Sequence, residues 1–520
     1  MRETDRDDYA EQRRALKLFA LFAGELIALS ILWLPITLDF SHFAFCDNGA
    51  ILTTLYLAEH GYRVGIDFGY HYGLLPILVA RIWYSLFSAA PVASQLLSIV
   101  GECIIAFALA RIAVALKFGP VAVALIAATI WIGVRADYPA IAHLAEAVLL
   151  CTALALQSAG RRRGALAFAC AAIFAKPSMG YLYSLWLLAF ELRRSGYGIS
   201  VRSLSRMLMP AAATAATAGT VLAIAYGPRE LVRTIFPIEG AIAYHALHYG
   251  FFTGSGRGFW ALPGSSWEFY LFSVAGFWLA ATVYLAAAAF RAARELWQAA
   301  PDDHSAQLRR SEIVLTCFVL HAAFVCLFFG NQWSWIYYSY FLIVGIAAAS
   351  EAGPTMARLG FALGIASMLS LSVVTVDLVG HWKTEKPIAS AAHLWALPAD
   401  ATEWAHVLQL TTGHRTAILD TKGAAELMYP QFEPPVSLYL DRGLMRRSEV
   451  HRKVAEIDSS ELIVVPIGIA TCGGIPDAPA LVSAMRRFAP IFQGRYFDVY
   501  RLREPFPAPV GAGNDSLQPH

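Results

Sequence analysis

The stretch "LLPILVARIWYSLFSAA", Leu74 to Ala90, decides how the rest of the chain is placed relative to a membrane. The chain has 520 residues, of which 57% are hydrophobic. Apolar runs of about 17 to 25 residues recur along roughly the first 380 positions, which indicates a multi-spanning membrane protein. Each span moves the chain to the other side of the membrane. Whether this run is counted as a span therefore decides on which side every later loop lies.

The positions of the basic residues indicate that this run does not cross the membrane. Lys and Arg in short loops are retained on the cytoplasmic side. If the run crossed, the cluster Arg161–Arg163 and Lys117 would lie outside, whereas omitting it places both inside together with the N-terminus. The run is also short, carries Arg81 at its middle and begins with a proline-bearing turn, features typical of a helix at the interface. We therefore predict an interfacial jutting helix.

The remaining apolar runs predict about eleven transmembrane helices, the first of them an uncleaved span and not a signal peptide. The predicted spans lie approximately at 18–38, 92–116, 119–135, 139–158, 164–178, 179–192, 207–227, 267–290, 312–330, 335–350 and 358–380. With these spans the loops rich in Lys and Arg fall inside, and the outside loops hold few cations.

This topology divides the chain into segments. Residues 1–17 form a cytoplasmic N-terminus, 18–380 a transmembrane domain whose first outer loop is 39–91, 381–505 an outer domain, and 506–520 a disordered tail rich in Pro and Gly. In the outer domain, "HRTAILDTKGAAELMY", "SSELIVVPIG" and "GRYFDVYRLREP" predict short β-strands between helical and turn segments. The predicted fold is an α-helical polytopic membrane protein with a small C-terminal α/β domain on the outer side.

Composition excludes several classes of function. A net charge of +2 does not suggest a nucleic-acid partner. The seven cysteines show no CxxC pairing, so neither a metal cage nor a disulfide framework is indicated. No GxxxxGK[ST] phosphate loop is present.

Polar chemistry is concentrated in the first outer loop. Asp47 precedes the helical pattern "NGAILTTLYLAEHG", where it could cap a helix, act chemically, or do both. The later part, "YRVGIDFGYHYGLLP", contains glycines and a final proline that predict a tight loop exposing Asp67, His71 and Tyr72, with Arg63 close by in sequence. An ordinary polar loop is the alternative interpretation of the same residues.

Three further places on the predicted outer face carry ionisable residues. Asp137 lies in "RADYP", before a span that contains His143 and Glu146, and it could instead simply pair with Arg135. Lys176 in "FAKPSMG" is a compact cation suited to a phosphate, or else it snorkels to the interface. The outer loop after the span at 207–227 contains His245, His248 and Arg257, which suit an anionic or sugar ligand, and an unspecific loop is the alternative interpretation of the same composition.

Such residues suit the transfer of a polar group from a lipid phosphate. A carboxylate is needed to deprotonate an acceptor hydroxyl, and cations are needed to stabilise the charge on the departing phosphate. Ionisable residues at membrane depth are costly, and they therefore indicate function.

The order of these motifs resembles the bacterial branch of the GT-C glycosyltransferases, which use polyprenyl-phosphate sugars. Asp47 matches the first residue of the family's Asp-Glu pair, and Asn48 stands where the second carboxylate is usual. "HYGLLP" is similar to the element before the family's jutting helix and points to His71. "RADYP" resembles the later acidic site at Asp137, and "AKPSMG" resembles the Lys-Gly turn at Lys176.

The resemblance implies an inverting transfer of a sugar to a cell-envelope glycan, lipid or protein acceptor. Asp47 would be the general base and Asp137 would orient Asp47 or the acceptor. The donor phosphate would be held by Lys176 and His71, together with either Arg63 or Arg257. Asp47, Asp67 and Asp137 could also supply oxygen ligands to Mg²⁺ or Mn²⁺, although no spacing demands it. The expected location is the bacterial inner membrane, with the active site and the C-terminal domain outside.

Two other classes of function remain open. A carrier or flippase for a lipid-linked sugar would use similar cations and aromatic residues without needing Asp47 as a base. A structural or assembly subunit would bind partners through the outer domain, and the polar first loop would then have no role.

Overall fold

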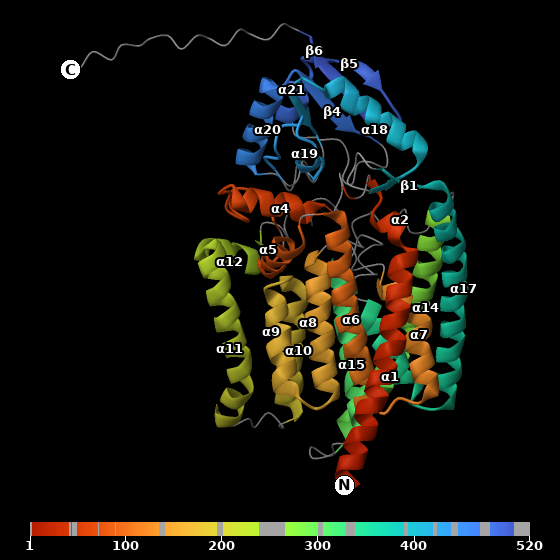
Figure 1. Cartoon of the computed structure of the whole chain (residues 1–520). Coiled ribbons are helices and arrows are strands. Elements are labelled where there is room, and N and C mark those ends of the chain that lie inside the picture. Colours follow the sequence, from red (N-terminus) through yellow and green to blue (C-terminus); the bar gives the residue numbers. More distant parts are fainter. Residues whose placement is uncertain are drawn as a thin grey trace, which may run out of the picture.

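The computed structural model describes residues 3–40, 43, 49–70, 72–88, 90–134, 141–194, 201–238, 266–299, 305–328, 339–388, 394–419, 424–437, 446–467 and 479–503. Long helices run side by side in a bundle, and a small mixed domain of strands and helices covers one end (Figure 1). The N-terminus lies at the opposite end of the bundle (Figure 1).

Each predicted span overlaps a helix of the bundle, although α1 begins at Glu3 and ends at Leu32 where the sequence predicts a span at 18–38. They are α1 (Glu3–Leu32), α6 (Pro91–Ala115), α7 (Pro120–Val134), α8 (Ile141–Ser158), α9 (Arg162–Ile173), α10 (Pro177–Arg194), α11 (Val201–Tyr226), α14 (Ser266–Gln298), α15 (Ala306–Phe328), α16 (Ser339–Ser350) and α17 (Pro354–Thr384). Among the described residues, 6 helices are long and apolar enough to cross a membrane. The predicted α-helical polytopic fold is therefore confirmed.

Shorter helices lie at the covered end of the bundle: α2 (Leu34–Thr37), α4 (Ala50–Glu59), α5 (Leu75–Phe87) and α12 (Pro228–Ile235). The 13 residues of α5 span only about 20 Å, too short for a hydrocarbon core of about 30 Å. Leu86 of α5 is 70% exposed and Ile82 is 55% exposed, while Ile77 is fully buried. A short helix with one apolar face open to its surroundings is typical of the interface, as predicted for this stretch.

The C-terminal domain contains two small sheets. Its elements are β1 (Lys386–Ile388), β2 (Leu394–Ala396), α18 (Pro398–Thr411), β3 (Thr416–Ile418), α19 (Ala424–Met428), α20 (Arg447–Ser459), β4 (Leu462–Pro466), α21 (Pro479–Met485), β5 (Phe488–Gln493) and β6 (Phe497–Leu502). The larger sheet has the order β3-β4-β6-β5, with β3 and β4 parallel and the other pairs antiparallel. The predicted small α/β domain is confirmed, and the three predicted strand segments contain β3, β4 and β6.

The apolar core of this domain is continuous with the first outer loop. The indole of Trp404 on α18 is fully buried, with its ring 5.1 Å from the ring of Phe40 and 4.8 Å from that of Phe497. The same core contains Leu55 of α4 and Ile77 of α5. The backbone N–H of Trp395 also donates to the carbonyl of Leu38, at 2.7 Å. The loop and the C-terminal domain therefore fold as one unit.

Candidate active site

The segment before α5 is tied to the turn between α9 and α10. The backbone N–H of Gly73 donates to the carbonyl of Ala175, and that of Leu75 donates to the carbonyl of Phe174, both at 2.9 Å. The two segments are so close that a Cβ on Gly73 would lie 1.9 Å from the carbonyl oxygen of Phe174. Glycine is therefore required at this position. The contact places Tyr72 beside Lys176, two residues that the sequence singled out separately.

Lys176 contacts two side chains of α8, those of His143 and Glu146. Its Nζ is 3.1 Å from Nδ1 of His143 and 4.0 Å from Oε2 of Glu146. The ring of Tyr72 packs edge-on against that of His143, with 5.5 Å between the centroids. Because a lysine ammonium can only donate, Nδ1 of His143 accepts and its proton lies on Nε2. Tyr72, His143, Glu146 and Lys176 are called the lysine cluster below.

Lys176 is the residue of this cluster whose positive charge a ligand can reach. The side chain of Lys176 keeps 18% of its surface exposed, while that of Glu146 keeps 1%. His143 is also buried, at 6%. A buried carboxylate and an imidazole thus hold the ammonium in place while part of the lysine side chain stays accessible. Such a fixed cation can stabilise charge that develops on a phosphate.

The Arg63 and Asp67 side chains contact each other. The guanidinium donates to both carboxylate oxygens, at 3.0 and 2.9 Å, and the Arg63 N–H donates to Oδ2 at 2.8 Å. These hydrogen bonds hold the pKa of the Asp67 carboxyl below its usual range. The pair joins two residues of the same loop, and it therefore fixes the conformation of the loop that leads to Tyr72.

Helix α20 of the C-terminal domain holds the same loop by its backbone. Arg446 donates to the carbonyl of Ile66 at 2.9 Å, and Arg452 donates to that of Asp67 at 2.8 Å. The buried Glu449 carboxylate accepts from the N–H of Gly69, at 3.0 Å. The C-terminal domain therefore positions the segment that carries Tyr72.

The remaining predicted site residues lie outside the part of the chain that the structure describes. These are Asp47, His71, Asp137, His245, His248 and Arg257. Their proposed roles stay predictions.

Sequence reasoning noted His143 and Glu146 within a span but gave them no role. Their signal was two ionisable residues three positions apart in an apolar helix, which places both on one face. Arg446, Glu449 and Arg452 were missed altogether. They bind backbone groups of a loop that is distant in sequence, and such contacts leave no motif.

The described residues contain no group of three or more His, Cys, Asp or Glu side chains that could hold a metal ion. Asp67, one of three carboxylates considered for Mg²⁺ or Mn²⁺, uses both its oxygens on Arg63. It therefore does not fit the role of a metal ligand in this arrangement.

Substituting Gly73 tests the contact that forms the lysine cluster. Gly73→Ala is expected to destabilise the fold by about 3 kcal/mol, because the new Cβ would meet a backbone carbonyl that cannot turn away. The thermal unfolding midpoint of the purified chain measures this. Gly24→Ala on α1 is the matched control, since nothing lies within 4 Å of its Cβ position. Equal midpoints for both variants would contradict the contact.

The fold and the cluster together define a class of protein. It is a multi-pass helical membrane protein with an α/β domain over one end and a fixed cation between two helices close to that end.

Comparison with known proteins gives one named likeness. The chain is similar to a solved structure described as "Crystal Structure of ArnT from Cupriavidus metallidurans bound to Undecaprenyl phosphate", with 13% sequence identity and a TM-score of 0.38. The match covers 91% of this chain and 97% of that one. No family model matches, and no curated protein matches. A likeness at this identity and TM-score does not decide the activity, and the function is argued below from the chain's own residues.

Proposed function

We propose that the chain is an inverting glycosyltransferase that moves a sugar from a polyprenyl-phosphate donor to a cell-envelope glycan, lipid or protein on the outer face of the bacterial inner membrane. The observation that carries the proposal is the lysine cluster. A reachable lysine held by His143 and Glu146 is suited to a phosphate. The order of motifs in the first outer loop supports the same reaction.

In the proposed reaction the acceptor hydroxyl attacks the anomeric carbon while its proton passes to Asp47. The bond between that carbon and the phosphate oxygen breaks, and its electron pair leaves with the polyprenyl phosphate. Lys176 stabilises the charge that develops on the departing phosphate. One direct displacement inverts the configuration at the anomeric carbon.

The other predicted residues would surround this centre. Asp137 would orient Asp47 or the acceptor, and His71 and Arg257 would contact the phosphate. His245 and His248 would contact the substrate as well. Arg63, which is bound to Asp67, would contribute through the half of its side-chain surface that stays exposed.

The rival function is a carrier that moves a lipid-linked sugar without chemistry. It would use the same cations but would not need a base at Asp47. Asp47→Asn in the full chain, reconstituted in vesicles with a polyprenyl-phosphate sugar and a hydroxyl acceptor, is expected to lower the transfer rate about 100-fold. Donor movement across the vesicle membrane is measured in parallel. Transfer at the wild-type rate in the variant would overturn this form of the enzyme proposal.

A further inference from the structure

A cavity of about 400 Å³ lies at the end of the bundle away from the C-terminal domain. It is formed where α8 turns into α9, beside the end of α10 and the start of α11. Figure 1 shows α12 at the other end of α11, beside α5, so the cavity is remote from the lysine cluster. This end carries the basic loops that orient the chain, which places the cavity on the cytoplasmic side.

Charge in the lining of this cavity is mostly positive. The lining contains Arg161, Arg162, Arg163 and one carboxylate, Glu191. Its apolar part consists of Leu204 and Met207 on α11. A cavity with cations on one side and apolar side chains on the other suits a ligand that is anionic at one end and apolar at the other.

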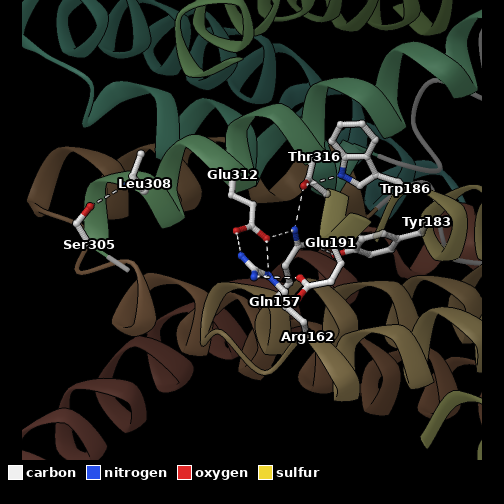
Figure 2. Close-up of polar contacts among 9 residues, drawn as sticks. All are labelled: Gln157, Arg162, Tyr183, Trp186, Glu191, Ser305, Leu308, Glu312 and Thr316. Carbon is white, nitrogen blue, oxygen red and sulfur yellow. Dashed lines mark hydrogen bonds and ion pairs between the residues drawn. The ribbon is translucent and has the colours of Figure 1, made fainter. Parts of the chain in front are cut away.

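Arg162 is fixed between two carboxylates. Figure 2 shows its guanidinium between Glu312 and Glu191. Its Nε donates to Glu312 at 3.2 Å, and its Nη1 is 3.2 Å from Glu191. Gln157 also donates to Glu312, at 3.0 Å, and accepts from Tyr183 at 2.6 Å. This network holds the start of α9 against α10 and α15, so the cavity has a rigid wall.

The two neighbouring arginines are left for a ligand. Arg161 and Arg163 are exposed, and within the described ranges neither side chain forms an ion pair. Arg161 directly precedes α9 and Arg163 lies in its first turn, where backbone N–H groups have no partner in the helix and favour an anion. Two arginines and the start of a helix around one cavity match the chemistry of a phosphate group.

We propose that this cavity binds the phosphodiester headgroup of an anionic phospholipid in the cytoplasmic leaflet. Arg161 and Arg163 donate to the phosphate oxygens, and Leu204 and Met207 contact the apolar part of the lipid. The lipid is favoured over a free phosphate because α11 continues from the cavity into a candidate span whose side chains face outward, with Met209 67% exposed. The site does not depend on the proposed transfer reaction.

Native mass spectrometry of the full chain in detergent tests this proposal. Phosphatidylglycerol is titrated against phosphatidylcholine with the same acyl chains. Arg161→Ser combined with Arg163→Ser is expected to lower phosphatidylglycerol affinity about 30-fold, since each basic residue near an anionic headgroup contributes about fivefold. Affinity for phosphatidylcholine is expected to stay unchanged.

A matched control removes the same charge away from the cavity. Arg13→Ser combined with Arg294→Ser is expected to leave phosphatidylglycerol affinity within about twofold of wild type, because neither residue lines the cavity. Equal losses in both double variants would show that only net charge matters and would overturn the site. Met207→Trp keeps all three arginines but fills the cavity, and it is expected to weaken phosphatidylglycerol binding as well.

Competition with inorganic phosphate distinguishes a lipid headgroup from a free phosphate ion as the ligand of this cavity. Under the proposal, millimolar phosphate leaves lipid binding unchanged. The contrary result has three parts: phosphate binds the wild type, phosphate binding is lost when Arg161 and Arg163 are both replaced by Ser, and the wild type shows no preference for phosphatidylglycerol. In that case the occupant is a free anion and the lipid proposal is wrong.

Discussion

Lys176→Met is expected to lower the rate of sugar transfer about 1000-fold, because it removes the fixed cation that the proposed reaction places beside the departing phosphate. The ammonium is held 3.1 Å from Nδ1 of His143, and methionine has the length of lysine but carries no charge to replace it. The transfer rate in vesicles at saturating donor measures the effect. Lys383→Met, an exposed lysine near the end of α17, is the matched control and is expected to keep the wild-type rate.

A structural role for Lys176 has a different outcome. Removing the lysine leaves the Glu146 carboxylate buried beside an apolar side chain, which itself destabilises the fold. Lys176→Met combined with Glu146→Gln removes this cost but does not restore the cation. If the double variant transfers sugar at the wild-type rate, Lys176 only balances charge and the proposed role is wrong. Persistent loss of activity with a normal unfolding midpoint supports the role.

Lys453→Met is expected to destabilise the C-terminal domain by about 3 to 5 kcal/mol, the largest effect on stability that we predict. The Lys453 ammonium contacts Glu426 at 2.8 Å and Glu456 at 2.9 Å, and its side chain is only 3% exposed. The substitution leaves both carboxylates buried without their cation. Thermal unfolding and limited proteolysis of the full chain measure the loss, with the exposed Lys386→Met as control.

The triad of Lys453, Glu426 and Glu456 also determines how its contribution to stability depends on pH. Burial lowers the pKa of Lys453, and the two carboxylates raise it by more, so the net shift is upward from 10.5. A raised pKa gives stability that is fully present below 10.5 and is lost only as the pH rises through the higher folded value. The contribution of Lys453 to stability is therefore expected to be constant from pH 7 to about pH 9, below its unfolded pKa. Lys453→Met combined with Glu426→Gln and Glu456→Gln is expected to recover most of the stability that Lys453→Met alone loses. If it does not, the two unpaired carboxylates are not the cause of that loss.

Much of the fold could be predicted because membrane helices can be identified in a sequence as long apolar runs. The short run at Leu74 to Ala90 was recognised as non-spanning from basic residues elsewhere in the chain, and α5 is indeed too short to cross. Strand β5 (Phe488–Gln493) was missed. It lies at the edge of its sheet, is largely exposed and contains Pro490, so its sequence lacks the buried apolar pattern of β4.

The site was predicted only in part, because its contacts join distant segments. Tyr72 and Lys176 were both chosen from local sequence, but the backbone pairing at Gly73 that brings them together has no signature before the fold is known. Arg63 and Asp67 were chosen as substrate ligands, and their spacing of four residues already allowed them to pair. Nothing local distinguishes these two uses of the same side chains.

The core shared by the first outer loop and the C-terminal domain has a consequence for biosynthesis. The loop is among the first parts of the chain to be made, yet the aromatic residues that complete its core, such as Trp404 and Phe497, are among the last. Helices of the bundle can pack while synthesis continues, but the loop lacks these final partners until the C-terminal domain has been made. A ribosome that stops before residue 404 therefore releases an inserted bundle whose outer loop is still open to proteases.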